Sequence, residues 1–187
     1  MREIALHILD IAQNSISAGA TLVEITVDEN PEEDVLTVVV RDNGCGMSEE
    51  FVKKVTDPFT TKRTTRKVGL GIPLIKLAAE STGGRFDIES KEGVGTVLTA
   101  VFGYSHIDRQ PLGDMAETML GMITSFEETD FLYIHRICGR EFRLDTREIK
   151  KVLGDVSLKN NEVYLWLSDY MREGEKEIEN ENGGKEI

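Results

Sequence analysis

The chain has 187 residues, of which 40% are hydrophobic and 30% charged, and its formal net charge is −12. This length suits one medium-sized domain, or one domain with a small appendage. The acidic charge excludes general binding to nucleic acid or to an anionic membrane, because these partners select for clustered Lys and Arg. The first residues do not resemble a signal peptide, and no apolar run approaches the roughly 20 residues of a membrane-spanning helix. We therefore expect a cytoplasmic protein without a membrane span.

The N-terminal segment predicts an amphipathic helix. Apolar residues recur at helical spacing over residues 3–18, and Gly19 is suited to end the helix. Polar side chains three and four residues apart stack on the other face as one stripe. This stripe consists of His7, Asp10, Asn14 and Ser17. For His7, a bond to a neighbouring side chain is the favoured interpretation, and support of the Asp10 carboxylate is the alternative.

Further elements follow from the spacing of the apolar residues, which alternate in strands and recur every three or four positions in helices. The predicted elements are strands at 21–28 and 34–42, a short helix at 49–55, a helix at 72–81, and strands at 85–90 and 96–102. A turn-rich segment separates the first two strands, so we expect them to form a hairpin. Residues 56–71 carry turn, hydroxyl and basic residues without apolar periodicity, which indicates a loop.

The stretch VVVRDNGCGM, residues 38–47, combines a strand pattern with an acid and two glycines. Its β-branched residues predict a buried strand, so the Asp42 carboxylate lies where the chain leaves the core and can face a cavity. Gly44 and Gly46 permit backbone conformations and close approach that a Cβ would block. The same letters also describe an ordinary tight turn. Taken alone, the stretch leaves both interpretations open.

Three features occur in a fixed order: a helix with Asp10 and Asn14 one turn apart, a strand that ends in Asp42 and DNGCGM, and GLGI opening a helix after a basic loop. In this order they resemble the Bergerat ATP-binding fold of histidine kinases, type II topoisomerases, mismatch-repair ATPases and a heat-shock chaperone family, the GHKL superfamily. LDIAQNSISAGAT is similar to the first box, DPFTTKRTTRKVGLGIPLIK to the sensor-kinase lid and second glycine box, and GVGTVLTAVF to the third. The resemblance covers about residues 3–102 and is closest to histidine kinase-like ATPase domains.

The resemblance implies an α+β fold, a two-layer α/β sandwich whose mixed, mostly antiparallel sheet carries helices on one face. The expected division is an ATP-binding domain at 1–103, a small C-terminal α+β appendage at 104–171 and an acidic tail at 172–187. The appendage predicts a Met-rich helix at 112–126, a hairpin of strands at 130–137 and 140–145, and helices at 146–153 and 162–171. The composition of the tail predicts disorder.

The resemblance also implies roles for individual residues. Asp42 would accept a hydrogen bond from the exocyclic amine of adenine, with Gly46 and Thr96 lining the same pocket. Asn14 would offer an oxygen to Mg²⁺, an ion that keeps several waters and binds substrate phosphates. Asp10 would orient or deprotonate a water or a substrate hydroxyl near the γ-phosphate, which makes it the candidate catalytic residue.

The phosphates of ATP would meet the second glycine box and the basic loop. Glycines just before a helix leave its free N–H groups and positive end accessible to an anion. Residues 62–67 gather several cations in an otherwise acidic protein, and Lys62 best matches the sensor-kinase pattern. The candidate cofactor-binding residues are Asn14, Asp42, Gly44, Gly46, Thr60, Thr61, Lys62, Gly69, Leu70, Gly71 and Thr96.

Three hypotheses for function remain open. We expect no phosphoacceptor domain, because the first box begins within a few residues of Met1, and residues 104–187 are too few for the transducer domain that the DNA-processing relatives need. The first hypothesis, and the favoured one, is a stand-alone kinase-like module that transfers the γ-phosphoryl group to a separate partner protein. The second is an ATP-hydrolysing conformational switch. The third is a non-catalytic adenine-nucleotide sensor, supported only by Asp10 in place of the Glu of the hydrolases.

Overall fold

The computed structural model describes residues 3–56 and 71–179 of the chain. Its elements, in chain order, are α1 (Ile4–Ser17), β1 (Leu22–Asn30), β2 (Val35–Asp42), α2 (Glu49–Val55), α3 (Gly71–Ser81), β3 (Arg85–Lys91), β4 (Gly95–Gly103), α4 (Met115–Ser125), β5 (Asp130–Ile137), β6 (Arg140–Asp145), α5 (Thr146–Leu153) and α6 (Asn161–Glu179). These elements agree with the types and order predicted from apolar spacing, including both hairpins.

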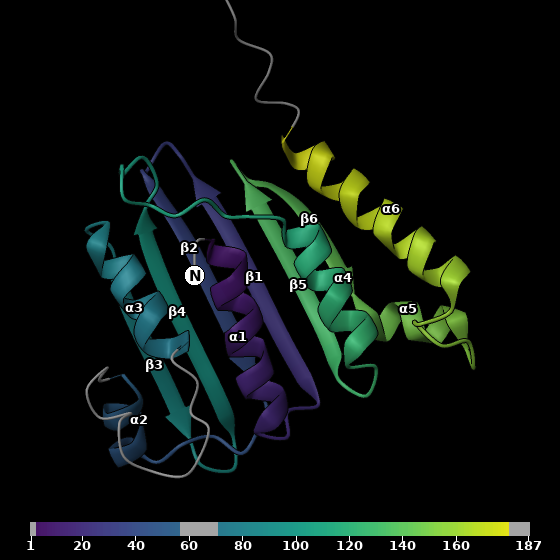
Figure 1. Ribbon diagram of the computed structural model, residues 1–187, viewed down its shortest axis with the longest axis horizontal. Coiled ribbons are helices and arrows are strands. Elements are labelled where there is room, and N and C mark those ends of the chain that lie inside the picture. The colour runs from purple at the N-terminus through teal and green to yellow at the C-terminus, as the bar shows by residue number, and fades with distance from the viewer. Residues whose placement is uncertain (1–2, 57–70, 180–187) are drawn as a thin grey trace, which may run out of the picture.

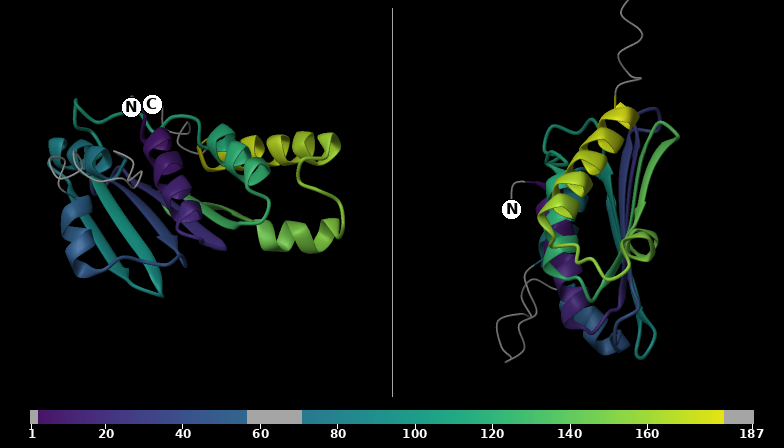
Figure 2. Two further views of the ribbon diagram at one scale, coloured as in Figure 1. Left: turned by 60° about the horizontal axis from the view of Figure 1, so that its bottom comes forward. Right: turned by 90° about the vertical axis from the view of Figure 1, so that its right-hand side faces the viewer.

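The strands form one sheet in the order β3-β4-β2-β1-β5-β6. Strand β1 pairs with β5 in parallel, and the other neighbouring strands are antiparallel. Helices α1, α3, α4 and α6 lie on one face of this sheet, as the edge-on view of Figure 2 shows. The predicted two-layer α+β sandwich with a mixed, mostly antiparallel sheet is therefore confirmed.

The core lies between the sheet and this helical layer. Every second residue is buried in β1 as far as Val27 and in β2 as far as Val40, as strand geometry requires when one face is covered. Opposite them, Ile4, Ile8 and Ile11 of α1 are buried at helical spacing. Ser48 caps the short helix α2 by accepting a hydrogen bond from the backbone N–H of Phe51. The sequence pattern thus fixes which face of each element is covered.

The residues after 103 extend the same sheet. Strand β5 pairs with β1 over its whole length, with Val23 opposite Phe131. The connection into α4 is also bonded to the start of α1, where the backbone N–H groups of Ile4 and Ala5 donate to the chain at 111–112. Figure 1 shows α4 beside α1 in the helical layer. A separate role for residues 104–171 stays a prediction, while their strands belong to the common sheet.

The prediction of a disordered tail from residue 172 is wrong for residues 172–179, which continue α6. Met171, Gly174 and Ile178 are buried on one side of this helix, so its buried face continues into the acidic segment. The dense charge of the segment concealed that spacing. Residues 180–187 lie outside the described part of the chain. No helix within residues 3–56 and 71–179 is long and apolar enough to cross a membrane.

A buried ionic cluster joins α6 to the sheet. His135 of β5 is 1% exposed, and its two ring nitrogens lie 3.0 Å from Glu29 Oε1 and 2.5 Å from Glu175 Oε2. Tyr133 donates from its hydroxyl to Glu175 Oε1 at 2.8 Å. Burial alone lowers the pKa of His135, but the two carboxylates outweigh burial and raise the pKa to about 9. The imidazolium is therefore the form that links β1, β5 and α6 at neutral pH.

Candidate functional site

A cavity of about 450 Å³ opens beside the last turn of α1, between the ends of β2 and β4 and the short helix α2. Its volume falls in the range of small-molecule sites. The lining residues are Asn14, Ser15, Ser17, Ala18, Asp42, Cys45, Gly46, Met47, Ser48, Phe51, Val55, Ile72, Glu92 and Thr96. The structure therefore brings Asn14, Asp42, Gly46 and Thr96 to one cavity, as the sequence predicted.

A second cavity, of about 410 Å³, lies around the same strand ends and shares Asp42 and Thr96 with the first. Two of its other charged lining residues, Glu24 and Arg41, form an ion pair between β1 and β2. It has no residue of α1 or α3 in its lining. The first cavity is therefore the one that contains most of the predicted site residues that line a cavity.

Asp42 lies at the floor of the first cavity because strand alternation puts it on the covered face. Val38 and Val40 precede it on that face and are buried in the core, and Thr96 is its partner on β4. Both carboxylate oxygens already accept a hydrogen bond. Oδ1 accepts from the backbone N–H of Gly44 at 2.9 Å, and Oδ2 accepts from the Ser15 hydroxyl at 2.6 Å. The carboxylate is thus held in one orientation by the chain on either side of it.

The loop after Asp42 is tied to two other segments. The backbone N–H of Cys45 donates to Ala18 at the end of α1, and the carbonyl of Cys45 accepts from Gly93 in the β3–β4 turn. Gly46 has φ of +66°, and a Cβ there would lie 2.0 Å from the backbone oxygen of Lys91. Only glycine fits this close approach. The stretch is therefore both a tight turn and a cavity wall, so the two interpretations left open by the sequence hold together.

Asn14 projects from the last part of α1 into the lining of the cavity. Its side-chain nitrogen is buried and has no hydrogen-bond partner among residues 3–56 and 71–179. Buried amides are nearly always paired in native proteins, so an unpaired one indicates a site for a further polar group. Asn14 is thus a polar group available to a ligand in the cavity.

Asp10 lies one helical turn before Asn14 and packs against the start of α3. A Cβ on Gly71 would lie 1.8 Å from Asp10 Oδ2, so a side chain at position 71 would displace this carboxylate. Asp10 does not line the cavity itself, and neither do Gly44 and Gly71, whereas Ile72 does. Asp10 therefore borders the cavity at the end where α3 begins.

Several predicted site residues lie outside the described part of the chain. They are Thr60, Thr61, Lys62, Gly69 and Leu70. His7, which shares the polar stripe of α1, is buried, and its Nε2 lies 2.9 Å from Gln110 Oε1. Burial lowers the pKa of His7, so the ring is neutral at physiological pH. The prediction that a neighbour satisfies His7 is confirmed for Nε2 alone, because Nδ1 is buried without a hydrogen-bond partner among residues 3–56 and 71–179.

Sequence reasoning missed two residues that support the site. Ser15 holds Asp42, and its signal was a serine on the apolar face of α1, at the helical spacing of Ile8 and Ile11. Ser90 of β3 lies within hydrogen-bond distance of the Met47 N–H, the Gly95 carbonyl and the Thr96 hydroxyl. No sequence signal marks Ser90, because its partners come from distant parts of the chain.

These features agree with a family match over residues 1–105, which fit the model of the histidine kinase-, DNA gyrase B- and HSP90-like ATPases. The match covers more than half of the chain. The chain belongs to this family. The expectation drawn from the boxes of the first half of the sequence is therefore confirmed.

Several curated relatives of this ATPase family member are sensor proteins. Sensor histidine kinase WalK of Bacillus subtilis (strain 168) is 37% identical over 87 residues, which is 44% of this chain and 14% of WalK. Sensor protein SrrB of Staphylococcus aureus (strain NCTC 8325 / PS 47) is 34% identical over 103 residues, which is 52% of this chain and 17% of SrrB. The chain spans less than a fifth of the length of the curated relatives it matches.

Two solved structures share the fold of this chain. The Aquifex aeolicus MutL ATPase domain complexed with ADP superposes with a TM-score of 0.51 at 18% identity, covering 82% of this chain and 69% of that one. The N-terminal domain of a DNA repair protein gives a TM-score of 0.55 at 14% identity, covering 85% and 59%. Both cover more of the chain than the family match does. The ATPase fold therefore includes strands beyond β4.

Proposed function

We propose that this ATPase-family chain binds Mg-ATP in the cavity beside α1 and transfers the γ-phosphoryl group to a separate partner protein. The observation that carries the proposal is the placement of Asp10 against Gly71, one helical turn from Asn14. This puts a carboxylate at the start of α3, beside a carboxamide that lines the cavity. The resemblance of the first half of the chain to sensor histidine kinases supports transfer to a protein.

The base end of the cavity suits adenine. Asp42 presents an acceptor at the floor, and an acceptor favours the exocyclic amine of adenine over the carbonyl of guanine. Met47, Val55 and Ile72 supply apolar walls on which a flat ring can pack. The ADP complex of the Aquifex aeolicus MutL domain, which has the same fold, supports an adenine nucleotide in this place.

The phosphate end suits Mg²⁺ held largely by its substrate. The side chain of Asn14 offers one carboxamide oxygen, and Mg²⁺ commonly takes one or two protein ligands together with phosphates and waters. Residues 3–56 and 71–179 contain no cluster of three or more His, Cys, Asp or Glu that could form a complete cage. Bound Mg²⁺ would neutralise phosphate charge, and Asn14 would hold it at the end of α1.

Phosphoryl transfer needs a group that positions the nucleophile and accepts its proton. The acceptor side chain would attack the γ-phosphorus, the bond from that phosphorus to the ADP oxygen would break, and the acceptor proton would pass to the Asp10 carboxylate. Helix α1 is fixed by its buried isoleucines, so Asp10 is presented by a rigid element. The main contribution of this chain to the reaction would therefore be to position the reacting groups.

The test is transfer of label from [γ-³²P]ATP, with purified protein alone and with lysate of the source organism. We expect a labelled partner protein and little label on the chain itself. Asp10→Asn removes the base while keeping size and polarity, so it should retain ATP binding and lower transfer by about 100-fold, a typical contribution of a general base.

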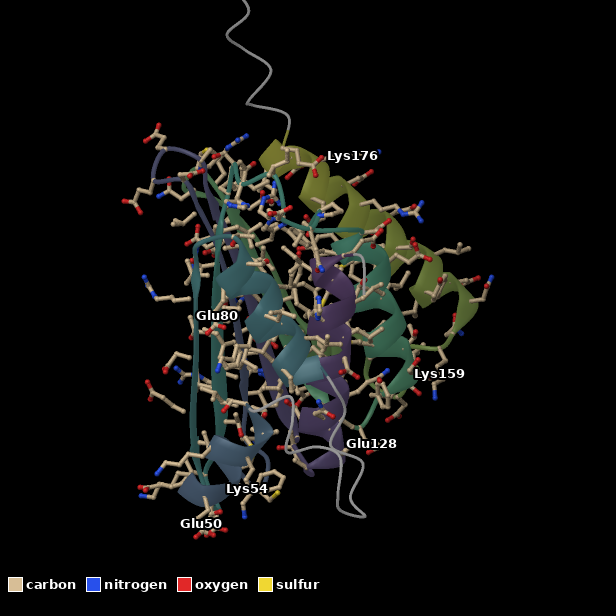
Figure 3. The ribbon with its side chains drawn as sticks, turned by 60° about the vertical axis from the view of Figure 1, so that its left-hand side comes forward. Glu50, Lys54, Glu80, Glu128, Lys159 and Lys176 are labelled. Atoms are coloured by element: carbon tan, nitrogen blue, oxygen red, sulfur yellow. The ribbon has the colours of Figure 1, made fainter. Side chains whose placement is uncertain are left out.

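The matched control is Glu80→Gln, which neutralises an exposed carboxylate of α3 that Figure 3 shows on the outer surface. This variant should transfer at the wild-type rate. Steady release of phosphate by the purified protein, dependent on Asp10 and without a labelled partner, would replace transfer by hydrolysis. If ATP binds but no partner is labelled and no phosphate is released, the chain is a nucleotide sensor.

A further inference from the structure

Ser15 donates a side-chain hydrogen bond to Asp42. Among residues 3–56 and 71–179, no other side chain of α1 does so. The Ser15 hydroxyl lies 2.6 Å from Asp42 Oδ2 and 3.3 Å from the carbonyl oxygen of Ile11. A hydroxyl has a single proton to donate. The shorter distance and the charge of the carboxylate assign that proton to Asp42, because hydrogen bonds to ionised groups are the stronger ones.

The position of Ser15 is rigid. Ser15 is 4% exposed, and the residues one and two turns before it on the same helical face, Ile11 and Ile8, are buried in the core. The helix cannot turn about its axis without exposing these side chains to water. Ser15 therefore holds its hydroxyl at a fixed point relative to the end of β2.

The two hydrogen bonds to Asp42 leave a defined set of lone pairs. An ionised carboxylate is only an acceptor, with about two lone-pair directions on each oxygen. Ser15 occupies one direction on Oδ2, and the N–H of Gly44 occupies one on Oδ1. The lone pairs that remain can only accept a hydrogen bond. A carboxylate locked in this way cannot rotate to present a different edge to the ligand.

We infer that Ser15 is the positioning residue that sets the preference of this site for a base with an exocyclic amine. The inference rests on the proposed binding of ATP and adds the source of base selectivity. Ser15 acts through Asp42, because its proton is already committed to that carboxylate. Since Asn14 is the preceding residue, two consecutive positions of one helix serve the two ends of the nucleotide.

The experiment compares two ligands that differ only in the amine: ATP and purine riboside triphosphate, which lacks the 6-amino group. Binding of each is measured by calorimetry with Mg²⁺ present, for the wild type and for Ser15→Ala. We expect Ser15→Ala to weaken the binding of ATP by about 10-fold, the usual effect of losing a hydrogen bond to a charged group. Binding of purine riboside triphosphate should stay unchanged, because that ligand has no amine for Asp42 to hold.

Two further variants complete the test. Ser81→Ala is the matched control, since Ser81 lies on α3 outside the cavity lining and donates its hydroxyl proton to the Ala78 carbonyl. It should bind both ligands as the wild type does. Ser15→Cys keeps the side-chain volume with a weak donor, so it should lose selectivity even if Ser15→Ala fails to fold.

The outcomes separate the inference from the proposed function. If the wild type binds neither ligand, the proposed function fails. Suppose that the wild type prefers ATP. If the folded Ser15 variants bind both ligands equally more weakly, or bind both as the wild type does, then Ser15 only supports the fold and the inference is overturned. A loss confined to ATP confirms it.

Discussion

The buried cluster of His135, Glu29 and Glu175 predicts that the protein loses stability between about pH 6.5 and pH 9. The pKa of His135 is raised to about 9 in the folded chain and returns to its ordinary value of 6.5 on unfolding. A group whose folded pKa is raised contributes its full stabilisation below the unfolded pKa, because the folded state then binds its proton more tightly. That contribution fades as the pH rises through the folded pKa.

The magnitude follows from the two pKa values. Each pKa unit corresponds to about 1.4 kcal/mol, so the raised pKa of His135 stabilises the fold by about 3 kcal/mol at pH 6. Between pH 6.5 and 9 the free energy of unfolding should fall by about 1.4 kcal/mol for each pH unit. This is a large part of the stability of an ordinary domain.

The assay is equilibrium urea unfolding at steps from pH 6 to pH 9.5, followed by circular dichroism and by the fluorescence of Trp166, the single tryptophan. The comparison variant is His135→Gln, which can still donate a hydrogen bond but does not titrate. The wild type should be more stable at pH 6, and the difference should shrink by about 3 kcal/mol by pH 9.5. A difference that stays constant across this range would refute a charged His135 in the folded protein.

Two glycine substitutions give further tests. Gly46→Ala should lower the free energy of unfolding by about 1–2 kcal/mol or more, because it puts a side chain at positive φ against Lys91. The open helical position Gly121→Ala should raise it by up to about 1 kcal/mol, and equal stability of the two variants in urea would contradict the close approach. Gly71→Ala should slow phosphoryl transfer by displacing Asp10, and adding it to Asp10→Asn should cause no further loss, whereas additive losses would mean that Gly71 acts independently.

The first half of the chain could be predicted from its sequence because its chemistry is local. The strand that ends at Asp42 and the spacing of Asp10 and Asn14 follow from short-range periodicity, so the structure places them as expected. The contacts between segments could not be predicted. The hydrogen bond from the Met47 N–H to Ser90 and the fit of Asp10 against Gly71 depend on how distant parts of the chain pack.

The C-terminal half was harder for a physical reason. Its helices and hairpin were predicted in type, but nothing in their local pattern shows that β5 pairs with β1 in parallel. The continuation of α6 was missed because glutamates occupy its exposed side and hide the buried spacing of Met171, Gly174 and Ile178. Glu175 belongs to the tail for which the sequence predicted disorder, whereas it lies in the cluster with His135.

The parallel pairing of β1 with β5 has a consequence for synthesis on the ribosome. Val23 pairs with Phe131, so about 100 further residues must be synthesised after β1 before its second neighbouring strand exists. At roughly 5–20 residues per second, this interval lasts about 5–20 s. During that time β1 is an open edge with unpaired backbone groups, and such edges invite pairing with other chains. The nascent protein is therefore most exposed to misassembly after its first four strands have emerged, which is when a chaperone would protect it best.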